Sequence, residues 1–159
     1  MSGALYAVTL AAALGCGLVA GVFFAFSSFV MAALKRLPAA EGVAAMQAIN
    51  ALAVTPMFMM VFFGTAAACL ASAVLAVISS NGLTVALALA GGALYIFGVV
   101  GVTIARNVPL NERLAGLRPR SADAAGVWGE YVNRWTVWNH LRTAASLVAS
   151  AILTFALHG

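Results

Sequence analysis

The chain has 159 residues, of which 64% are hydrophobic and 8% are charged, and its formal net charge is +4. Apolar runs of about 18 residues or more, separated by short breaks, exclude an ordinary soluble domain and predict a small all-α polytopic membrane protein. The eight basic residues lie around the ends of the apolar runs, where they set orientation and meet lipid headgroups, so nucleic-acid binding is not expected. The length leaves room for a single domain over residues 1–159.

The sequence contains few residues in a pattern that could bind a metal ion. Cys16 and Cys69 lie in apolar segments without a CxxC spacing, so both are expected to pack as small apolar residues. Three methionines at 57, 59 and 60 form a weak copper pattern because no cysteine or histidine accompanies them. His140 and His158 stand at opposite ends of an apolar run and cannot share one metal or haem. We therefore expect no metal site.

The first predicted span covers residues 4–34 and contains no charge. It is longer than the roughly 20 residues that a bilayer core needs, so it must tilt or project beyond the hydrocarbon. Gly17, Gly21 and Ala25 recur every four residues and form a small-residue stripe that lets another helix approach closely, within the chain or in a homo-oligomer.

A short interfacial helix is predicted at residues 39–53, after Pro38 ends the first span. Among its few polar side chains, Gln47 and Asn50 are three residues apart, a spacing at which both can hydrogen-bond one ligand. Capping or solvation is the commoner role of such residues.

The second and third spans are predicted at residues 54–78 and 83–104, joined by an uncharged turn at residues 79–82. Proline is tolerated in the first turn of a helix, as at Pro56. The third span contains four glycines, expected to pack closely against the small-residue stripe of the first span. Tyr95 is its only large polar group at middle depth and needs a partner or a ligand.

A polar segment follows the third span. Thr103, Asn107 and Asn111 would share a helical face if the helix continued, but Pro109 is expected to break or kink it. The break would leave both asparagines near the interface, as a helix cap or as part of a site. A longer amphipathic connection leads to a helix starting near Asp123 and to a fourth span at residues 135–157.

Residues 128–142 hold all three tryptophans of the chain together with a glutamate, a histidine and two arginines. Helical spacing places Trp135, Trp138, Asn139 and Arg142 on one face, whereas His140 lies on another. Arg142 lies furthest into the apolar run and needs a partner, for which Glu130, Glu41 and an asparagine cluster are the candidates. Glu130 also has the spacing of a helical ion pair with Arg134.

The charge distribution predicts the orientation. Every lysine and arginine lies in or beside the first and third connections, so these connections are expected in the cytoplasm and both termini outside. The predicted location is the inner (plasma) membrane of a bacterial-type cell.

Four motifs in this order resemble the anthrone oxygenase-like family of small four-helix membrane proteins: FFAFSSFVMAAL, MQAIN, RNVPLN and W-x6-W-x2-WNHLRT. The resemblance extends over nearly the whole chain. It implies oxidation of an anthrone to an anthraquinone by molecular oxygen without a bound metal or flavin, and hence no cofactor. The family positions that match are Asn107, Pro109, Asn111, Trp135, Asn139 and Arg142.

Such an oxidation requires a base, a donor that stabilises an enolate and an apolar aromatic pocket, which we expect at the cytoplasmic end of the bundle. The best base is His140, because histidine is the side chain that most often transfers protons in catalysis. The remaining catalytic candidates are Arg142 and Asn139, and the substrate-binding candidates are Asn107, Asn111, Trp135, Trp138, Thr103, Tyr95, Gln47 and Asn50.

A second functional class stays open. In it the chain is a non-enzymatic membrane protein that binds a small molecule or lipid, or a structural subunit of a larger complex. Tryptophan, histidine and arginine near an interface also commonly form an aromatic belt and a headgroup anchor.

Overall fold

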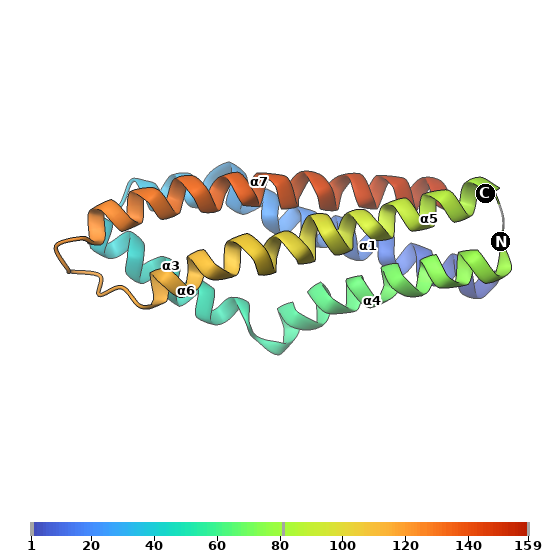
Figure 1. Ribbon diagram of the computed structural model, residues 1–159, viewed down its shortest axis with the longest axis horizontal. Helices are drawn as coiled ribbons and strands as arrows, with labels where there is room; N and C mark the ends of the chain where they lie inside the picture. The colour runs from blue at the N-terminus through green and yellow to red at the C-terminus, as the bar shows by residue number, and fades with distance from the viewer. Residues whose placement is uncertain (1, 81, 159) are drawn as a thin grey trace.

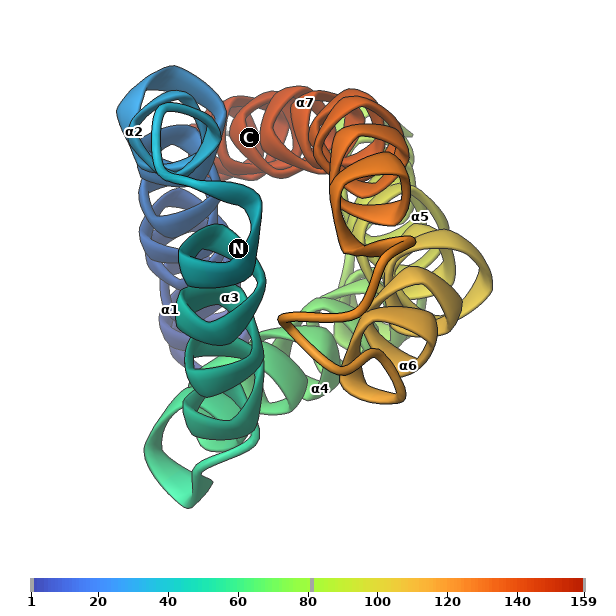
Figure 2. The ribbon, with the colours of Figure 1, turned by 90° about the vertical axis from the view of Figure 1, so that its left-hand side faces the viewer.

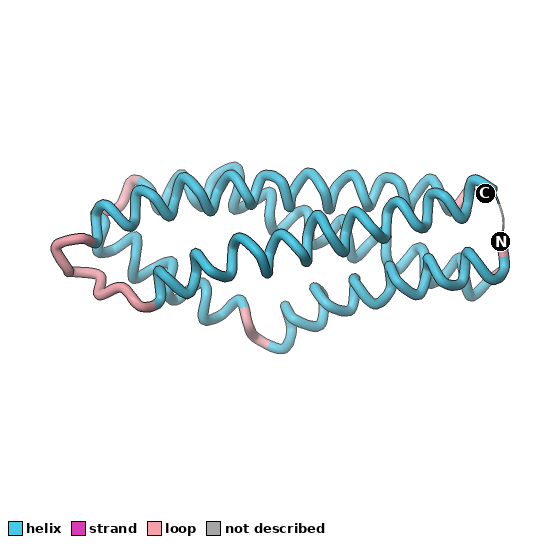
Figure 3. Tube along the Cα trace, in the orientation of Figure 1, coloured by secondary structure: helices cyan, strands magenta, loops and turns pink. Residues whose placement is uncertain are grey.

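The computed structural model describes residues 2–80 and 82–158, which fold into helices joined by short loops and contain no strand (Figures 1 and 3). Helix α1 (Gly3–Ala25) continues through a π-helical turn, η1 (Phe26–Val30), into α2 (Met31–Lys35). The short helix α3 (Ala39–Ala53) precedes α4 (Pro56–Ser79). Helix α5 (Gly82–Tyr95) continues through η2 (Ile96–Gly101) and η3 (Thr103–Asn107) into α6 (Val108–Ala115), and α7 (Ala124–Ala156) follows.

Three continuous helices are long and apolar enough to cross a membrane: Gly3–Lys35, Pro56–Ser79 and Gly82–Ala115. They correspond to the first three predicted spans and show a multi-pass membrane protein suited to a lipid bilayer. Pro56 stands in the first turn of α4, as expected. Helix α3 has the predicted bounds, and α7 begins beside Asp123. Helix α7 does not belong to the apolar set, since polar and charged residues occupy its first half.

Of the break or kink expected at Pro109, the break is wrong. The helix runs on to Ala115, well beyond the predicted end at residue 104. The π-helical turn η3 ends two residues before Pro109, and the backbone N–H of Val108 reaches the carbonyl of Thr103, five residues earlier. Proline removes one helical hydrogen bond and its ring crowds the preceding turn, and a widened turn accommodates both effects.

The long helices lie side by side around a common axis (Figure 2). Helix α7 contacts both α1 and α5, and α4 contacts the same two helices on the other side. At the end of the molecule away from the termini, α3 and α6 pack against the first half of α7 (Figure 1). The central core is built around Cys16, Cys69, Phe62 and Tyr95. A second core, here called the end core, contains Met31, Leu34, Val43, Met46, Leu110, Leu114, Trp128, Tyr131, Val132 and Trp135.

Small residues permit close helix approach, but between helices other than those expected. In the third helix, Gly91 and Gly98 face Leu153 and Ala145 of α7, and Gly92 faces the backbone of α4. Gly17 of α1 faces Ser150 of α7, whereas a Cβ added at Gly21 would meet no atom of another helix within 4 Å. The predicted contact between the two glycine-rich surfaces is therefore wrong, because α7 and α4 occupy the positions between α1 and α5.

Helix α4 ends at Ser79 and α5 begins at Gly82, the outer residues of the predicted turn. Asn81 lies outside the described residues. Gly82 has a φ of 60°, in the left-handed region that favours glycine over residues with a Cβ.

Gly42 positions α3 against α7, which predicts a marked effect of substitution. A Cβ at Gly42 would lie 2.7 Å from the buried ring of Trp128, closer than packed carbon atoms can come. We expect Gly42→Ala to destabilise the protein by about 1–3 kcal/mol, since the rigid indole must shift. Gly129→Ala on the exposed side of α7 is the matched control and is expected to stabilise by up to about 1 kcal/mol. Thermal melting in detergent compares the two; equal melting temperatures would contradict this packing.

Candidate functional site

Arg142 lies on the inner face of α7 and is 4% exposed. One terminal nitrogen of its guanidinium donates to Oδ1 of Asn139 at 2.8 Å, and the other donates to the hydroxyl of Thr103 at 3.1 Å. Asn139 is three residues earlier on the same helix, whereas Thr103 comes from η3. The arginine thus joins the fourth long helix to the third.

Two aromatic rings flank the same guanidinium. Its central carbon lies 4.2 Å from the ring centre of Phe23 and 5.2 Å from that of Trp135. A cation over an aromatic face is attracted to the ring electrons, and the attraction grows when water is excluded. The rings therefore stabilise the cation without neutralising it.

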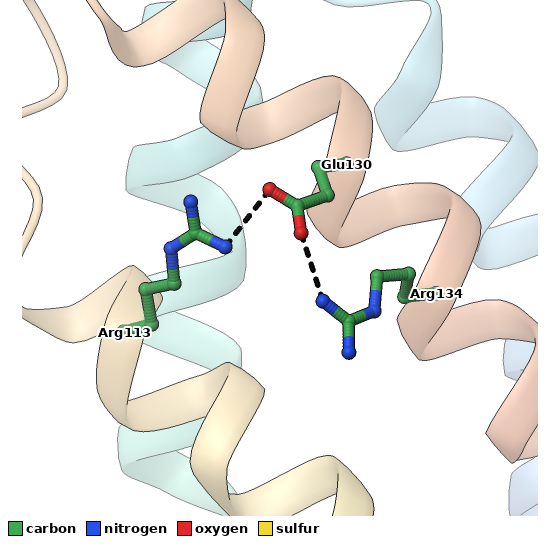
Figure 4. Close-up of polar contacts among 3 residues, drawn as sticks. All are labelled: Arg113, Glu130 and Arg134. Carbon is green, nitrogen blue, oxygen red and sulfur yellow. Dashed lines mark hydrogen bonds and ion pairs between the residues drawn. The ribbon is translucent and has the colours of Figure 1, made fainter.

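No carboxylate of the described residues forms an ion pair with Arg142. Of its predicted partners, Glu130 instead accepts from Arg113 of α6 and from Arg134 of α7, both at 2.8 Å, where the three side chains are partly exposed (Figure 4). Arg134 and Arg113 together hold the pKa of Glu130 below its usual range by donating hydrogen bonds to the carboxylate. The expected Glu130–Arg134 ion pair is confirmed. Of the partners predicted for Arg142, an asparagine, Asn139, is the one that it contacts.

Asn139 is fully buried and joins α7 to α1. Its Nδ2 donates to the backbone carbonyl of Phe23 at 2.7 Å and to the hydroxyl of Ser27 at 2.8 Å. These acceptors flank the start of η1, where the helix changes to the wider π-helical turn. A side-chain donor at such a turn satisfies an acceptor that an uninterrupted α-helix would satisfy itself.

The two asparagines that follow the third predicted span meet Trp135. Nδ2 of Asn107 lies 3.4 Å from the backbone carbonyl of Trp135, while Oδ1 of Asn107 is buried without a partner. Oδ1 of Asn111 accepts from the indole N–H of Trp135 and from the hydroxyl of Tyr131, both at 2.9 Å. We define the Arg142 cluster as Phe23, Ser27, Thr103, Asn107, Trp135, Asn139 and Arg142.

Three predicted substrate-binding residues have other partners. Nε2 of Gln47 donates to the carbonyls of Leu114 and Leu117, where α6 ends, so Gln47 caps that helix. Asn50 reaches the hydroxyl of Tyr131 at 3.4 Å rather than sharing a ligand with Gln47. Tyr95 belongs to the central core, where its hydroxyl donates to the carbonyl of Phe62 at 3.1 Å. Each of the three side chains thus donates to a protein group.

His140 and Trp138 lie towards the outside of α7. His140 is exposed and does not join the Arg142 cluster, and its role as the base stays a prediction. The helical period turns each residue by about 100° from the last, which separates His140 from its neighbour Asn139. Trp138 is half-buried and lies under the guanidinium of Arg106, 4.9 Å from the ring centre.

Phe23 and Tyr131 were not among the candidates predicted from sequence. Tyr131 falls three residues after Trp128 and four before Trp135, so the helical period signals it, and its ring stacks on both indoles. Phe23 comes from α1, and nothing in its local sequence distinguishes it from the other phenylalanines of that apolar run.

The pockets found in the structure lie away from the Arg142 cluster. One of about 480 Å³ lies between the start of α3 and the loop before α7, where Glu41, Arg118 and Arg120 line it. Another, of about 10 Å³, lies between α6 and α7 beside Tyr131. Within the described ranges, no group of three or more histidine, cysteine or acidic residues could hold a metal ion. The cluster itself combines buried polar and aromatic side chains with the half-buried hydroxyls of Ser27 and Thr103.

Comparison with known protein families identifies one that covers much of the chain. Residues 57–152, well over half of the chain, match the family model described as anthrone oxygenase. The matched part contains Thr103, Asn107, Trp135, Asn139 and Arg142, whereas the α1 members of the cluster precede it. No curated protein and no solved structure matches the chain.

Proposed function

Because the chain belongs to the anthrone oxygenase family, we propose that it is a membrane oxygenase that oxidises a lipophilic aromatic carbon acid of the anthrone type with O2. The observation that carries this proposal is the buried guanidinium of Arg142, which has no carboxylate partner among the described residues. An isolated buried charge costs several kcal/mol of folding free energy. A residue retained at that cost is suited to stabilising a negative charge on a ligand.

The chemistry requires such a charge. An anthrone has a CH2 group beside aromatic rings and across the ring from a carbonyl, and loss of one C–H proton places negative charge on the carbonyl oxygen. A guanidinium at that oxygen stabilises the anion and so makes the carbon more acidic. Arg142 supplies the donor, and the aromatic side chains of Phe23 and Trp135 beside it make the surroundings of the substrate rings apolar.

The proposed overall reaction balances without a further reductant. The CH2 group loses two protons and four electrons and becomes a carbonyl, while O2 accepts four electrons. One oxygen atom enters the product and the other leaves as water. The C–H protons pass to water at the site and end in the water that is formed, and the electron-rich anion passes the first electron to O2. The chain therefore needs to supply binding, charge stabilisation and limited access of bulk water, and no metal or cofactor enters the proposal.

We also propose that residues 1–159 form one domain, a four-helix bundle in which α7 is the fourth span. Helix α7 contacts α1 and α5, which are themselves apolar enough to cross the membrane. Both termini lie at one end of the molecule, and the basic loop before α7 lies at the other (Figure 1). The positive-inside rule then supports an inner-membrane protein with both termini outside and the Arg142 cluster towards the cytoplasm.

This orientation predicts a labelling pattern in intact cells. A cysteine placed at Ser79 is expected to react with a membrane-impermeant maleimide, whereas one at Arg118 is expected to react only after the cells are opened. The unsubstituted chain is the blank, because Cys16 and Cys69 are both buried. If the cysteine at Arg118 were labelled in intact cells and the one at Ser79 were not, the orientation would be the opposite of the one proposed.

Oxygen uptake tests the proposed activity. Purified protein in detergent is supplied with anthrone, and O2 consumption and quinone absorbance are followed against a detergent blank and against Arg142→Met. The proposal requires wild-type turnover above both controls. Saturable binding of anthrone without turnover would instead favour a small-molecule or lipid binder.

His140→Ala is expected to leave turnover within about twofold of wild type, because the side chain is exposed and surface substitutions change free energies by only about 0.5 kcal/mol. The measurement is the same oxygen assay, with melting temperature as the check on folding. A loss of activity of about a hundredfold, the size of a general-base contribution, would support His140 as the base.

A further inference from the structure

Two buried polar atoms at the Arg142 cluster have no partner among the described residues: Oδ1 of Asn107 and Nε of Arg142. The residues are 1% and 4% exposed, so bulk water does not satisfy either atom. The orientation of the Asn107 amide follows from its other contact. The carbonyl of Trp135 can only accept, so the Asn107 nitrogen must face it and the amide oxygen must face away. One acceptor and one donor N–H are therefore left over.

The two atoms belong to one neighbourhood around Trp135. Asn107 contacts the Trp135 backbone, and the Arg142 guanidinium lies over the Trp135 ring. Arg142 also donates to Thr103, which is one turn before Asn107 in η3. Residues four apart on a helix lie on the same side, so Thr103 and Asn107 present their side chains to the same region.

We propose that Asn107 and Arg142 form a hydroxyl-binding site that selects the enol form of the substrate. The ligand oxygen accepts from the Arg142 Nε–H and donates its own proton to Oδ1 of Asn107. A ketone oxygen has no proton for Asn107, and an ether oxygen has none either, so both leave the amide oxygen buried and unpaired. The ligand class is a fused aromatic ring system that carries a phenolic or enolic O–H.

This inference rests on the proposed function in one respect, because it names the form in which an anthrone is held. An anthrone and its enol interconvert by moving one proton from carbon to oxygen. A site that satisfies both a donor and an acceptor at that oxygen stabilises the enol over the ketone. When the enol proton leaves during oxidation, Arg142 stabilises the charge that remains on the oxygen.

Stable phenols test the site without turnover. Quenching of tryptophan fluorescence is titrated with 2-naphthol and with its methyl ether, 2-methoxynaphthalene, each corrected for partition into detergent. We expect the wild type to bind the phenol about tenfold or more tightly, the effect of one hydrogen bond to a buried group. In Asn107→Leu, which has similar volume and no acceptor, we expect the phenol to lose this advantage while the ether keeps its affinity.

Asn133→Leu is the matched control, since Asn133 is an exposed asparagine on α7 and its substitution should leave the preference unchanged. Equal wild-type affinity for phenol and ether would overturn the proposal. So would a preference that survives in Asn107→Leu, or absence of saturable quenching by either probe, as expected if a permanently bound water satisfies both atoms. Selective phenol binding without oxygen uptake would refute the oxygenase function and leave the hydroxyl site intact.

Discussion

Replacing Arg142 by methionine is expected to lower turnover of an anthrone by about 10²- to 10³-fold, the usual loss when one donor to a developing oxyanion is removed. Folding should respond differently. The guanidinium has no carboxylate partner that would be left buried and charged, so removing it eliminates an unbalanced charge. Against this, Oδ1 of Asn139 and the hydroxyl of Thr103 each lose a donor. The two effects oppose each other, and we expect only a small change in melting temperature.

Oxygen uptake and thermal melting in the same detergent measure the two quantities. Arg142→Lys is the informative companion, since it keeps the charge but loses the planar set of five donors, and it should retain part of the activity. A large fall in melting temperature for Arg142→Met would show that the arginine acts mainly in folding. Full activity of that variant would remove the basis of the proposed oxygenase mechanism.

Asn139→Ala is expected to destabilise the protein more than any other polar substitution in the cluster, by about 3 kcal/mol or more. Its amide donates to the Phe23 carbonyl and the Ser27 hydroxyl and accepts from Arg142, so truncation leaves polar groups of three residues without this partner. Each buried group left unpaired costs about 1–3 kcal/mol.

Unfolding in increasing sodium dodecyl sulfate, followed by helical circular dichroism, gives the change in free energy of unfolding. Asn133→Ala on the exposed side of the same helix is the control and should change stability by less than about 0.5 kcal/mol. Similar stabilities of the two variants would mean that Asn139 does not hold α7 against α1.

Local sequence determined most of the helical elements. Long uncharged runs predict the ends of the first two apolar helices to within about two residues. In lipid an apolar segment forms a helix because a helix satisfies its own backbone hydrogen bonds. The change in composition after Pro38 predicts α3 at its observed bounds. The helical period also placed Asn139 and Arg142 on one face, since that relation depends only on positions along one helix.

Only the tertiary structure decided what each face meets. His140 and Arg142 are two residues apart and both have polar side chains. His140 is exposed and Arg142 is buried, because α1 and α5 cover one side of α7. Gln47 donates hydrogen bonds to backbone carbonyls at the end of α6, which is distant in the sequence. Pro109 remains in a continuous helix because the turn before it widened to a π-helical turn.

The site itself combines both kinds of information. That Arg142 is buried and has protein partners follows from its position in an apolar run, where a charge needs a partner. That its partners are Asn139, Thr103 and two aromatic rings, and not Glu130 or Glu41, depends on the rotation of α7 relative to α1 and η3. Rotation of one helix against another is set by packing between segments distant in sequence, which no local pattern specifies.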